Sequence, residues 1–177
     1  IYFYPTFLRL ARRLGEWVMG RTVPGDDKVL LLALIAGTVP AVFFGLLLEN
    51  TMETVFRSAE LVALSLIAGS VLFYVAERLA RQTESVSIKK GLWIGLFQSL
   101  ALIPGISRSG ATISGGLLLG LTRENAARFG FLLAFPIIVG SGAKKLFELS
   151  QSGYLGSFGI ELFVGALVSF LVGMLAI

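Results

Sequence analysis

Residues Lys89–Gly116, KKGLWIGLFQSLALIPGISRSGATISGG, decide how the rest of the chain is interpreted. Arg108 stands between two serines in an otherwise apolar run, shortly after Pro104-Gly105. The apolar arms on either side, residues 91–103 and 109–121, are each about half a bilayer long at ~1.5 Å per helical residue. Two half-length arms that meet at a polar tip broken by Pro-Gly predict a re-entrant helix–loop–helix.

We expect this hairpin to cover about residues 89–121, to enter and leave on the same side of a membrane, and to place residues 107–109 near mid-depth. Non-helical backbone persists at that depth only where protein or a wet cavity satisfies its polar groups. An ionisable side chain there is a functional hypothesis by default. The alternative is a plain surface loop between helices, since Pro-Gly pairs commonly mark loops.

The composition is that of a membrane protein. Of 177 residues, 55% are hydrophobic and 15% are charged, whereas soluble domains carry about 25% charged residues. The chain has no cysteine and no histidine, which excludes disulfides, Cys/His metal sites and an imidazole base within it. The net charge of +4 fits basic cytoplasmic loops, so we expect no nucleic-acid partner.

The apolar segments predict an all-α integral membrane protein, a multi-spanning helical bundle. Expected spans are about residues 29–49, 60–80, 126–148 and 159–177. We treat residues 1–177 as one transmembrane domain, and as a partial one because the chain opens without Met and closes inside an apolar run. The spacing of apolar residues over 6–20 predicts either an amphipathic helix at the membrane interface or the end of a spanning helix that begins earlier.

Smaller patterns accompany the spans. An aspartate at Asp26-Asp27 is suited to cap the first span, and Gly91-x-x-x-Gly95 and Gly116-x-x-x-Gly120 predict close helix packing. Basic residues gather on one side, which is therefore cytoplasmic: Arg9, Arg12, Arg13, Arg21, Lys28, Arg78, Arg81, Lys89, Lys90, Arg123 and Arg128, against Arg57, Lys144 and Lys145 on the other. Charge alone does not decide whether the hairpin is re-entrant. If the segment spanned the membrane instead, Arg123 and Arg128 would change sides with Lys144 and Lys145, and the count of basic residues on each side would stay the same.

The tip has the composition of a phosphate site. Arg108 presents a planar fork of donors that matches phosphate oxygens and stays charged. Helix N-termini favour anions, and the second arm begins at the tip. Hydroxyl donors and small residues that admit a ligand surround the arginine: Ser107, Ser109, Thr112, Gly105 and Gly110. We expect a lipid phosphate as ligand. The alternative is that Arg108 pairs with a buried carboxylate as structural glue.

The hydroxyl side chains are expected to have different roles. Ser109 is placed to cap the second arm, with its oxygen accepting N–H bonds from about Ala111 or Thr112. Ser107 is then free to contact the phosphate, and Thr112 can reach back to the same anion. Gln98 either faces the pocket or makes a hydrogen bond between packed helices.

The motif QSLALIPGISRSGAT at residues 98–112 resembles the signature of the bacitracin-resistance type undecaprenyl-diphosphate phosphatases. Residues 35–42 and 129–136 also resemble that family's flanking helices, so the resemblance covers nearly the whole chain. It implies a membrane hydrolase that releases phosphate from undecaprenyl diphosphate and so recycles the lipid carrier of cell-wall synthesis. It also implies an inverted-repeat fold with two facing hairpins, a bacterial cytoplasmic membrane and a pocket open to the outside.

One departure from the family pattern affects the site. The family's N-terminal hairpin, with its Glu-rich motif and a segment ending in His, is not found here, and we expect its last helix to be absent from the sequence as well. The resemblance therefore implies that this chain alone is inactive or nearly so. It implies a divalent cation, Mg²⁺ or Ca²⁺, whose ligands lie outside this chain, so no metal ligand is assigned to these residues.

Two other function classes stay open from the sequence. Paired re-entrant hairpins also build transporters, so a transporter or flippase for an anionic lipid is one alternative. A structural membrane segment is the other. A homodimer is an option that the sequence leaves undecided.

Overall fold

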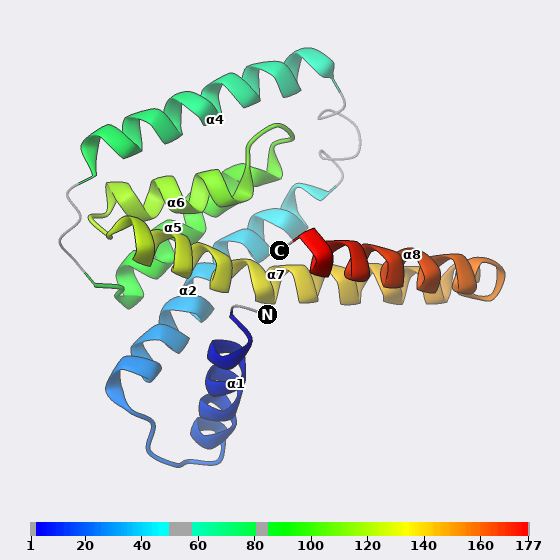
Figure 1. Cartoon of the computed structure of the whole chain (residues 1–177), viewed down its shortest axis with the longest axis horizontal. Coiled ribbons are helices and arrows are strands. Elements are labelled where there is room, and N and C mark those ends of the chain that lie inside the picture. The colour runs from blue at the N-terminus through cyan, green and yellow to red at the C-terminus, as the bar shows by residue number, and fades with distance from the viewer. Residues whose placement is uncertain (1–2, 50–57, 81–84, 177) are drawn as a thin grey trace. The chain divides into compact units, whose positions relative to one another are not determined.

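The computed structural model describes residues 3–49, 58–80 and 85–176, and its regular elements in these ranges are helices. They are, in chain order, α1 Tyr4–Val18, α2 Gly25–Leu47, α4 Ala59–Leu79, α5 Ile88–Ser99, the short 3₁₀ helix η2 Leu100–Leu102, α6 Arg108–Leu118, α7 Arg123–Gln151 and α8 Tyr154–Ala176 (Figure 1). The all-α prediction is confirmed. Arg57 and Arg81, used above for orientation, lie outside the described residues.

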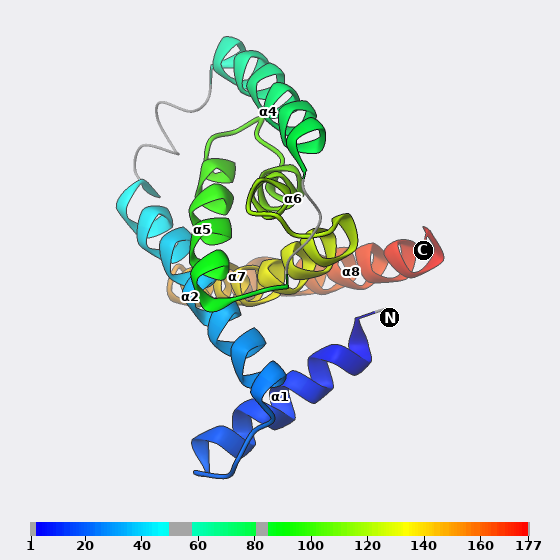
Figure 2. The same cartoon turned by 90° about the vertical axis from the view of Figure 1, so that its left-hand side faces the viewer.

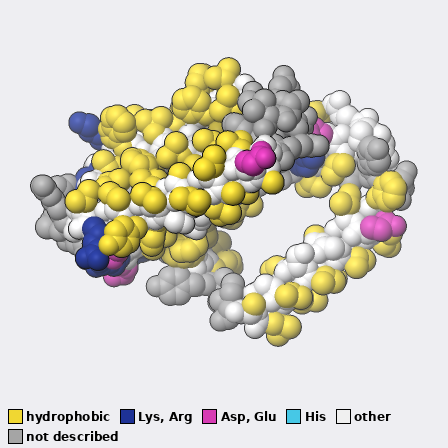
Figure 3. Space-filling model, turned by 90° about the horizontal axis from the view of Figure 1, so that it is seen from above, with side chains coloured by type: hydrophobic (Ala, Val, Ile, Leu, Met, Phe, Trp, Pro, Cys, Tyr) yellow, Lys and Arg dark blue, Asp and Glu magenta, His cyan; other side chains and the backbone are white. Residues whose placement is uncertain are grey.

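Four of the described helices are long and apolar enough to cross a membrane: Gly25–Leu47, Ala59–Leu79, Arg123–Gln151 and Phe158–Ala176. The expected spans fall on these helices, α2, α4, α7 and α8. Little of α4 is buried by the rest of the chain, and large apolar side chains such as Leu64, Ile67 and Tyr74 are exposed along it. In Figure 3 hydrophobic side chains cover much of the visible face, and charged ones appear at only a few places. Such a surface suits a hydrocarbon solvent.

The chain divides into two compact units, Ile1–Ile137 and Ile138–Ile177. The first contains the core and the hairpin. The second contains the end of α7 and α8; in α8, backbone torsions at Phe158 are non-helical (φ −127°), so the regular apolar helix follows that residue. Within the second unit Lys145 pairs with Glu148 at 2.9 Å, and no residue of α8 whose burial is described is buried.

Helices α2 and α5 pack backbone to backbone through glycine (Figure 2). A Cβ added to Gly91 would lie 2.4 Å from the carbonyl oxygen of Ala33, and one added to Gly95 would lie 2.1 Å from that of Gly37. Both distances are far below van der Waals contact, so only glycine fits. The packing prediction for Gly91 and Gly95 is confirmed.

The second glycine pair serves two purposes. A Cβ on Gly116 would lie 2.8 Å from the Cβ of Ala126, so Gly116 lets α6 approach the start of α7. Gly120 instead has φ +82° and ends α6, because its N–H bonds the carbonyl of Leu117 and the next N–H, of Leu121, bonds that of Gly116. This arrangement is a Schellman-type helix stop. The structure thus shows Gly120 as a helix stop, and close packing at Gly120 stays a prediction.

Ion pairs connect α1 to the start of α2. Asp27 lies 3.2 Å from Arg13 and 3.6 Å from Arg9, and Arg13 also bonds Glu16 at 2.7 Å. The hydrogen bond from Arg13 holds the pKa of the Glu16 carboxyl below its ordinary value. The expected aspartate cap was wrong, since α2 begins after Pro24 without a side-chain cap bond. Asp27 lies in the first turn, where it pairs with arginines instead.

Candidate functional site

The predicted hairpin is built from α5, η2 and α6. Ser87 caps α5 by accepting a hydrogen bond from the N–H of Lys90 at 3.3 Å, and α5 passes into η2 after Ser99. A turn follows in which the N–H of Ile106 bonds the carbonyl of Ile103 at 3.1 Å. Pro104 and Gly105 occupy its centre with Gly105 at φ +102°, the pattern of a type II turn. The region is thus two helices around a break; that it re-enters a membrane stays a prediction.

Helix α4 covers this turn. A Cβ added to Gly105 would lie 2.5 Å from the carbonyl oxygen of Val62 and 3.0 Å from the Cβ of Ser65. Together with the positive φ, this contact explains why glycine is needed at the position: the turn and the packing of α4 both require it. Room for a ligand, the reason expected from the sequence, is not what fixes Gly105.

Helix α6 begins one serine earlier than expected. Its N-cap is Ser107, whose oxygen accepts a hydrogen bond from the N–H of Gly110 at 3.2 Å. Ser109 is the second residue of the helix, and its hydroxyl lies 3.2 Å from that of Ser107. The capping prediction for Ser109 was therefore wrong. Extended backbone at Ser107 (φ −66°, ψ 124°) places it at the cap, immediately before Arg108 enters the helix.

Arg108 is the first residue of α6 and its side chain is exposed. No carboxylate of the described part of the chain pairs with it, so the structural-glue alternative has no partner there. The backbone N–H groups of Arg108 and Ser109 open the helix, where an α-helix has no intrahelical acceptor for them. A guanidinium fork and free N–H donors at a helix N-terminus form a site suited to a phosphate.

Thr112 lies beneath this surface. Its side chain is buried, and its hydroxyl lies 3.1 Å from the carbonyl oxygens of both Arg108 and Ser109, to which it donates. Helix α7 covers it closely, since a Cβ on Gly130 would lie 2.7 Å from the hydroxyl oxygen. The expected reach of Thr112 toward the anion is not part of this arrangement. Its contacts instead hold the first turn of α6 against α7.

Two buried polar side chains of the hairpin have no hydrogen-bond partner in the described structure. They are Gln98 on α5, at both its amide oxygen and nitrogen, and Ser114 on α6. Buried polar groups are normally paired, so such exceptions call for a water, a ligand or another protein segment. The alternative of a helix-packing hydrogen bond for Gln98 is not found among the described residues. Ser114 was missed from the sequence, although its spacing of seven from Ser107 places it on the same side of α6.

The donors of the tip do not fit a metal ion. In the described ranges no group of three or more Asp, Glu, His or Cys residues is placed to hold one. A guanidinium and backbone N–H groups repel a cation. The donor set of the tip suits an anion better than a cation.

The chain matches known proteins along its whole length. The family model described as "Bacitracin resistance protein BacA" matches residues 1–177. Proteins named undecaprenyl-diphosphatase are 42% identical in Micrococcus luteus (97% of this chain, 64% of that protein) and 41% identical in Rubrobacter xylanophilus (100% and 66%). One from Mycolicibacterium smegmatis is 42% identical (95% and 64%). The chain thus spans about two thirds of the length of these curated relatives.

The family match covers every helix described above, including the PGISRSGAT tip, and the four apolar helices are those of a multi-pass membrane protein. This chain belongs to the bacitracin resistance protein BacA family.

Proposed function

We propose that the complete protein hydrolyses undecaprenyl diphosphate to undecaprenyl phosphate and inorganic phosphate, and that the hairpin tip binds the diphosphate. The observation that carries the proposal is the exposed Arg108, without a carboxylate partner in the described structure, at the N-terminus of α6. The relatives' names, undecaprenyl-diphosphatase, supply the substrate. In this proposal the enzyme returns the lipid carrier to cell-wall synthesis.

Each group at the tip has a distinct part in binding. Arg108 donates in parallel to two oxygens of the terminal phosphate, which fixes its orientation. The free N–H groups of Arg108 and Ser109 and the Ser109 hydroxyl bind further oxygens. Ser107 caps the helix that carries these donors. Preorganised donors of this kind also stabilise charge that develops during phosphoryl transfer.

The attacking group and its base are not assigned to the tip. Ser107 and Ser109 are hydroxyls without a base: the sequence has no histidine, and neither serine is bonded to a carboxylate in the described structure. A serine activated for attack needs such a base within hydrogen-bond reach. Within the proposal the tip therefore holds and orients the substrate. The chemistry that cleaves the phosphoanhydride comes from groups outside the described residues.

The proposal includes a divalent cation, Mg²⁺ or Ca²⁺, for the complete enzyme. In the described ranges no group of three or more Asp, Glu, His or Cys residues is placed to hold the ion, so its ligands would come from outside these residues. Chelation followed by addition of either ion to the full-length protein tests this part. Turnover unchanged by a chelator would remove the cation from the proposal.

The setting of the enzyme is also part of the proposal: the bacterial cytoplasmic membrane, with the pocket open to the outer leaflet. The bacterial relatives and the apolar helices support this setting. A homodimer is proposed because Gly165, Ser169 and Gly173 form a small-residue stripe on the exposed α8, and such stripes let membrane helices approach closely. Cross-linking in membranes at Ser169→Cys would detect the dimer, and its absence would refute it.

A transporter for anionic lipids gains no support, because the relatives compared are named for diphosphate hydrolysis. The deciding experiment measures phosphate released from undecaprenyl diphosphate by the full-length protein in detergent, where no membrane separates two sides. Arg108→Ala should lower kcat/KM by on the order of 100-fold, while Arg21→Ala, an exposed arginine outside the tip, should not. Absence of phosphate release by the unmodified protein would reject the proposal.

A further inference from the structure

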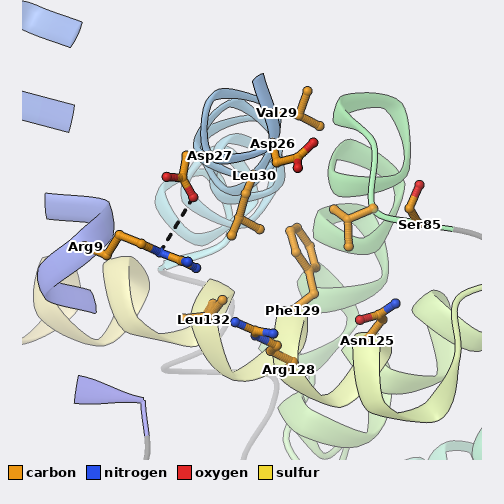
Figure 4. Close-up of a pocket in the computed structure, with 11 residues that line it drawn as sticks. Arg9, Asp26, Asp27, Val29, Leu30, Ser85, Asn125, Arg128, Phe129 and Leu132 are labelled. Atoms are coloured by element: carbon orange, nitrogen blue, oxygen red, sulfur yellow. Dashed lines mark ion pairs between the residues drawn. The ribbon is translucent and has the colours of Figure 1, made fainter. Parts of the chain in front are cut away.

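A second candidate site lies apart from the hairpin tip. A pocket of about 460 Å³ lies among α1, α2, the residues before α5 and the first turns of α7 (Figure 4). All of these belong to the first compact unit. Its charged lining residues are Arg9, Asp26, Asp27 and Arg128, and apolar side chains such as Leu30 and Phe129 complete the wall.

Part of this charge is already neutralised within the protein. Asp27 lies 3.6 Å from Arg9, the pair joined by the dashed line in Figure 4, and 3.2 Å from Arg13. Asp26 and Arg128 are both exposed, and neither has an ion-pair or hydrogen-bond partner in the described part of the chain. In the view of Figure 4 they lie on opposite sides of the Phe129 ring. One free anion and one free cation thus face the same pocket.

The lining changes from charged to apolar along the helices. Asp26 is in the first turn of α2, whereas Leu30 is one turn further into the apolar span. Arg128 precedes Phe129 near the start of α7, and Phe129 is almost fully buried. The neighbouring helix α1 exposes Tyr4, Leu8 and Val18, as an interfacial helix does. The pocket therefore crosses the boundary between a polar and an apolar environment, which suits an amphiphile.

We propose that this pocket binds the headgroup of a zwitterionic aminophospholipid from the cytoplasmic leaflet. The primary ammonium of the lipid donates hydrogen bonds to the Asp26 carboxylate, and its phosphate accepts from the Arg128 guanidinium. The acyl chains lie along the apolar wall. Basic pockets between membrane helices on the cytoplasmic side bind lipid phosphates; here Arg128 supplies the basic group, and Asp26 adds an acceptor for the ammonium. A purely anionic headgroup matches the site less well, because the Asp26 carboxylate would repel it and stay unpaired.

The test is lipid retention by the purified full-length protein in native mass spectrometry, with equal amounts of phosphatidylethanolamine, phosphatidylcholine and phosphatidylglycerol. We expect at least about tenfold preferential retention of the ethanolamine lipid, a difference of ~1.4 kcal/mol. The choline lipid has a cation of the same charge but no ammonium hydrogen to donate, so it isolates the contribution of those hydrogen bonds. The glycerol lipid isolates the contribution of the cation itself.

Two substitutions assign the contacts. Asp26→Asn should remove the preference for the ethanolamine lipid over the glycerol lipid, and Arg128→Gln should lower retention of both. Arg21→Gln, an exposed arginine outside the pocket, should change neither. Both pocket side chains are exposed, so folding should be kept, which a thermal melt of each variant verifies. Equal retention of the ethanolamine and glycerol lipids, or an unchanged preference in Asp26→Asn, would overturn the proposal. Phosphate release from undecaprenyl diphosphate is read separately and does not bear on it.

Discussion

The hydroxyl oxygen of Ser107 accepts a hydrogen bond from the N–H of Gly110 at 3.2 Å, which makes Ser107 the residue that starts helix α6. Arg108 follows as the first helical residue. Arg108, which is proposed to bind phosphate, is therefore positioned by helix α6, and the start of this helix depends on the preceding residue, Ser107. This relationship separates the stability of the tip from its binding chemistry, and the two can be tested apart.

Ser107→Ala should lower the free energy of unfolding by about 1 kcal/mol, because it removes the cap of α6. Ser109→Ala should cost less stability and lower turnover, because the Ser109 hydroxyl does not cap α6 and is a phosphate donor in the proposal. Ser107→Asn is the matched control, since asparagine caps helices about as well as serine. Thermal melts in detergent beside turnover of the full-length enzyme measure both effects. An early melt of Ser109→Ala with a normal melt of Ser107→Ala would contradict this assignment.

Arg108→Lys should impair the full-length enzyme nearly as much as Arg108→Ala. Lysine keeps the positive charge but loses the planar fork that binds two phosphate oxygens at once. The measurement is kcat/KM for undecaprenyl diphosphate at matched expression. Near-normal activity of the lysine variant would show that charge alone is sufficient and that bidentate geometry has no role.

The two helices around a Pro-Gly turn could be predicted from sequence because their signals are local. A Pro-Gly pair, two short apolar arms and an arginine between serines each act within a few residues. The exchange of roles between Ser107 and Ser109 could not be predicted, since either serine can cap a helix and the choice depends on where the type II turn ends. The position of the turn depends on α4, because Gly105 packs against the backbone carbonyl of Val62, more than thirty positions earlier in the chain. Distant packing of this kind leaves no local pattern.

The same limit applies to Gly105 and Thr112. The sequence predicts that both serve a ligand, because small and hydroxyl residues cluster near Arg108. In the structure Gly105 is required by its positive φ and by the carbonyl of Val62, and Thr112 is covered by Gly130 of α7. By contrast, Gly91 and Gly95 were predicted correctly, because a four-residue glycine spacing in an apolar helix already specifies a packing face.

Gln98→Met should raise the free energy of unfolding by on the order of 1 kcal/mol. Gln98 is buried with neither amide atom hydrogen-bonded in the described structure, and a buried unsatisfied polar group destabilises the folded state. Methionine has a similar length and no such group. Turnover should fall if the amide serves the substrate. A lower melting temperature in the methionine variant would instead show that a buried water or another segment satisfies the amide.

Gly95→Ala should destabilise the crossing of α2 and α5. An alanine Cβ there would lie 2.1 Å from the carbonyl oxygen of Gly37, which is backbone and has little freedom to move aside. The helices would have to separate, which should lower the free energy of unfolding by about 1–3 kcal/mol. Because α5 leads into the tip, turnover should fall as well.

Gly15→Ala provides the control for this glycine substitution. Gly15 lies inside α1, and a Cβ there meets nothing within 4 Å, so the same change should stabilise that helix by about 0.5–1 kcal/mol through its lower conformational entropy. Thermal melts of the two variants in the same detergent compare glycine-to-alanine at position 95, where the helices are in contact, with the same change at position 15, where nothing lies nearby. Glycine at position 95 is required only if its alanine variant melts early while the Gly15 variant does not. Equal melting temperatures for the two would show that α2 and α5 are less closely packed in solution than this crossing requires.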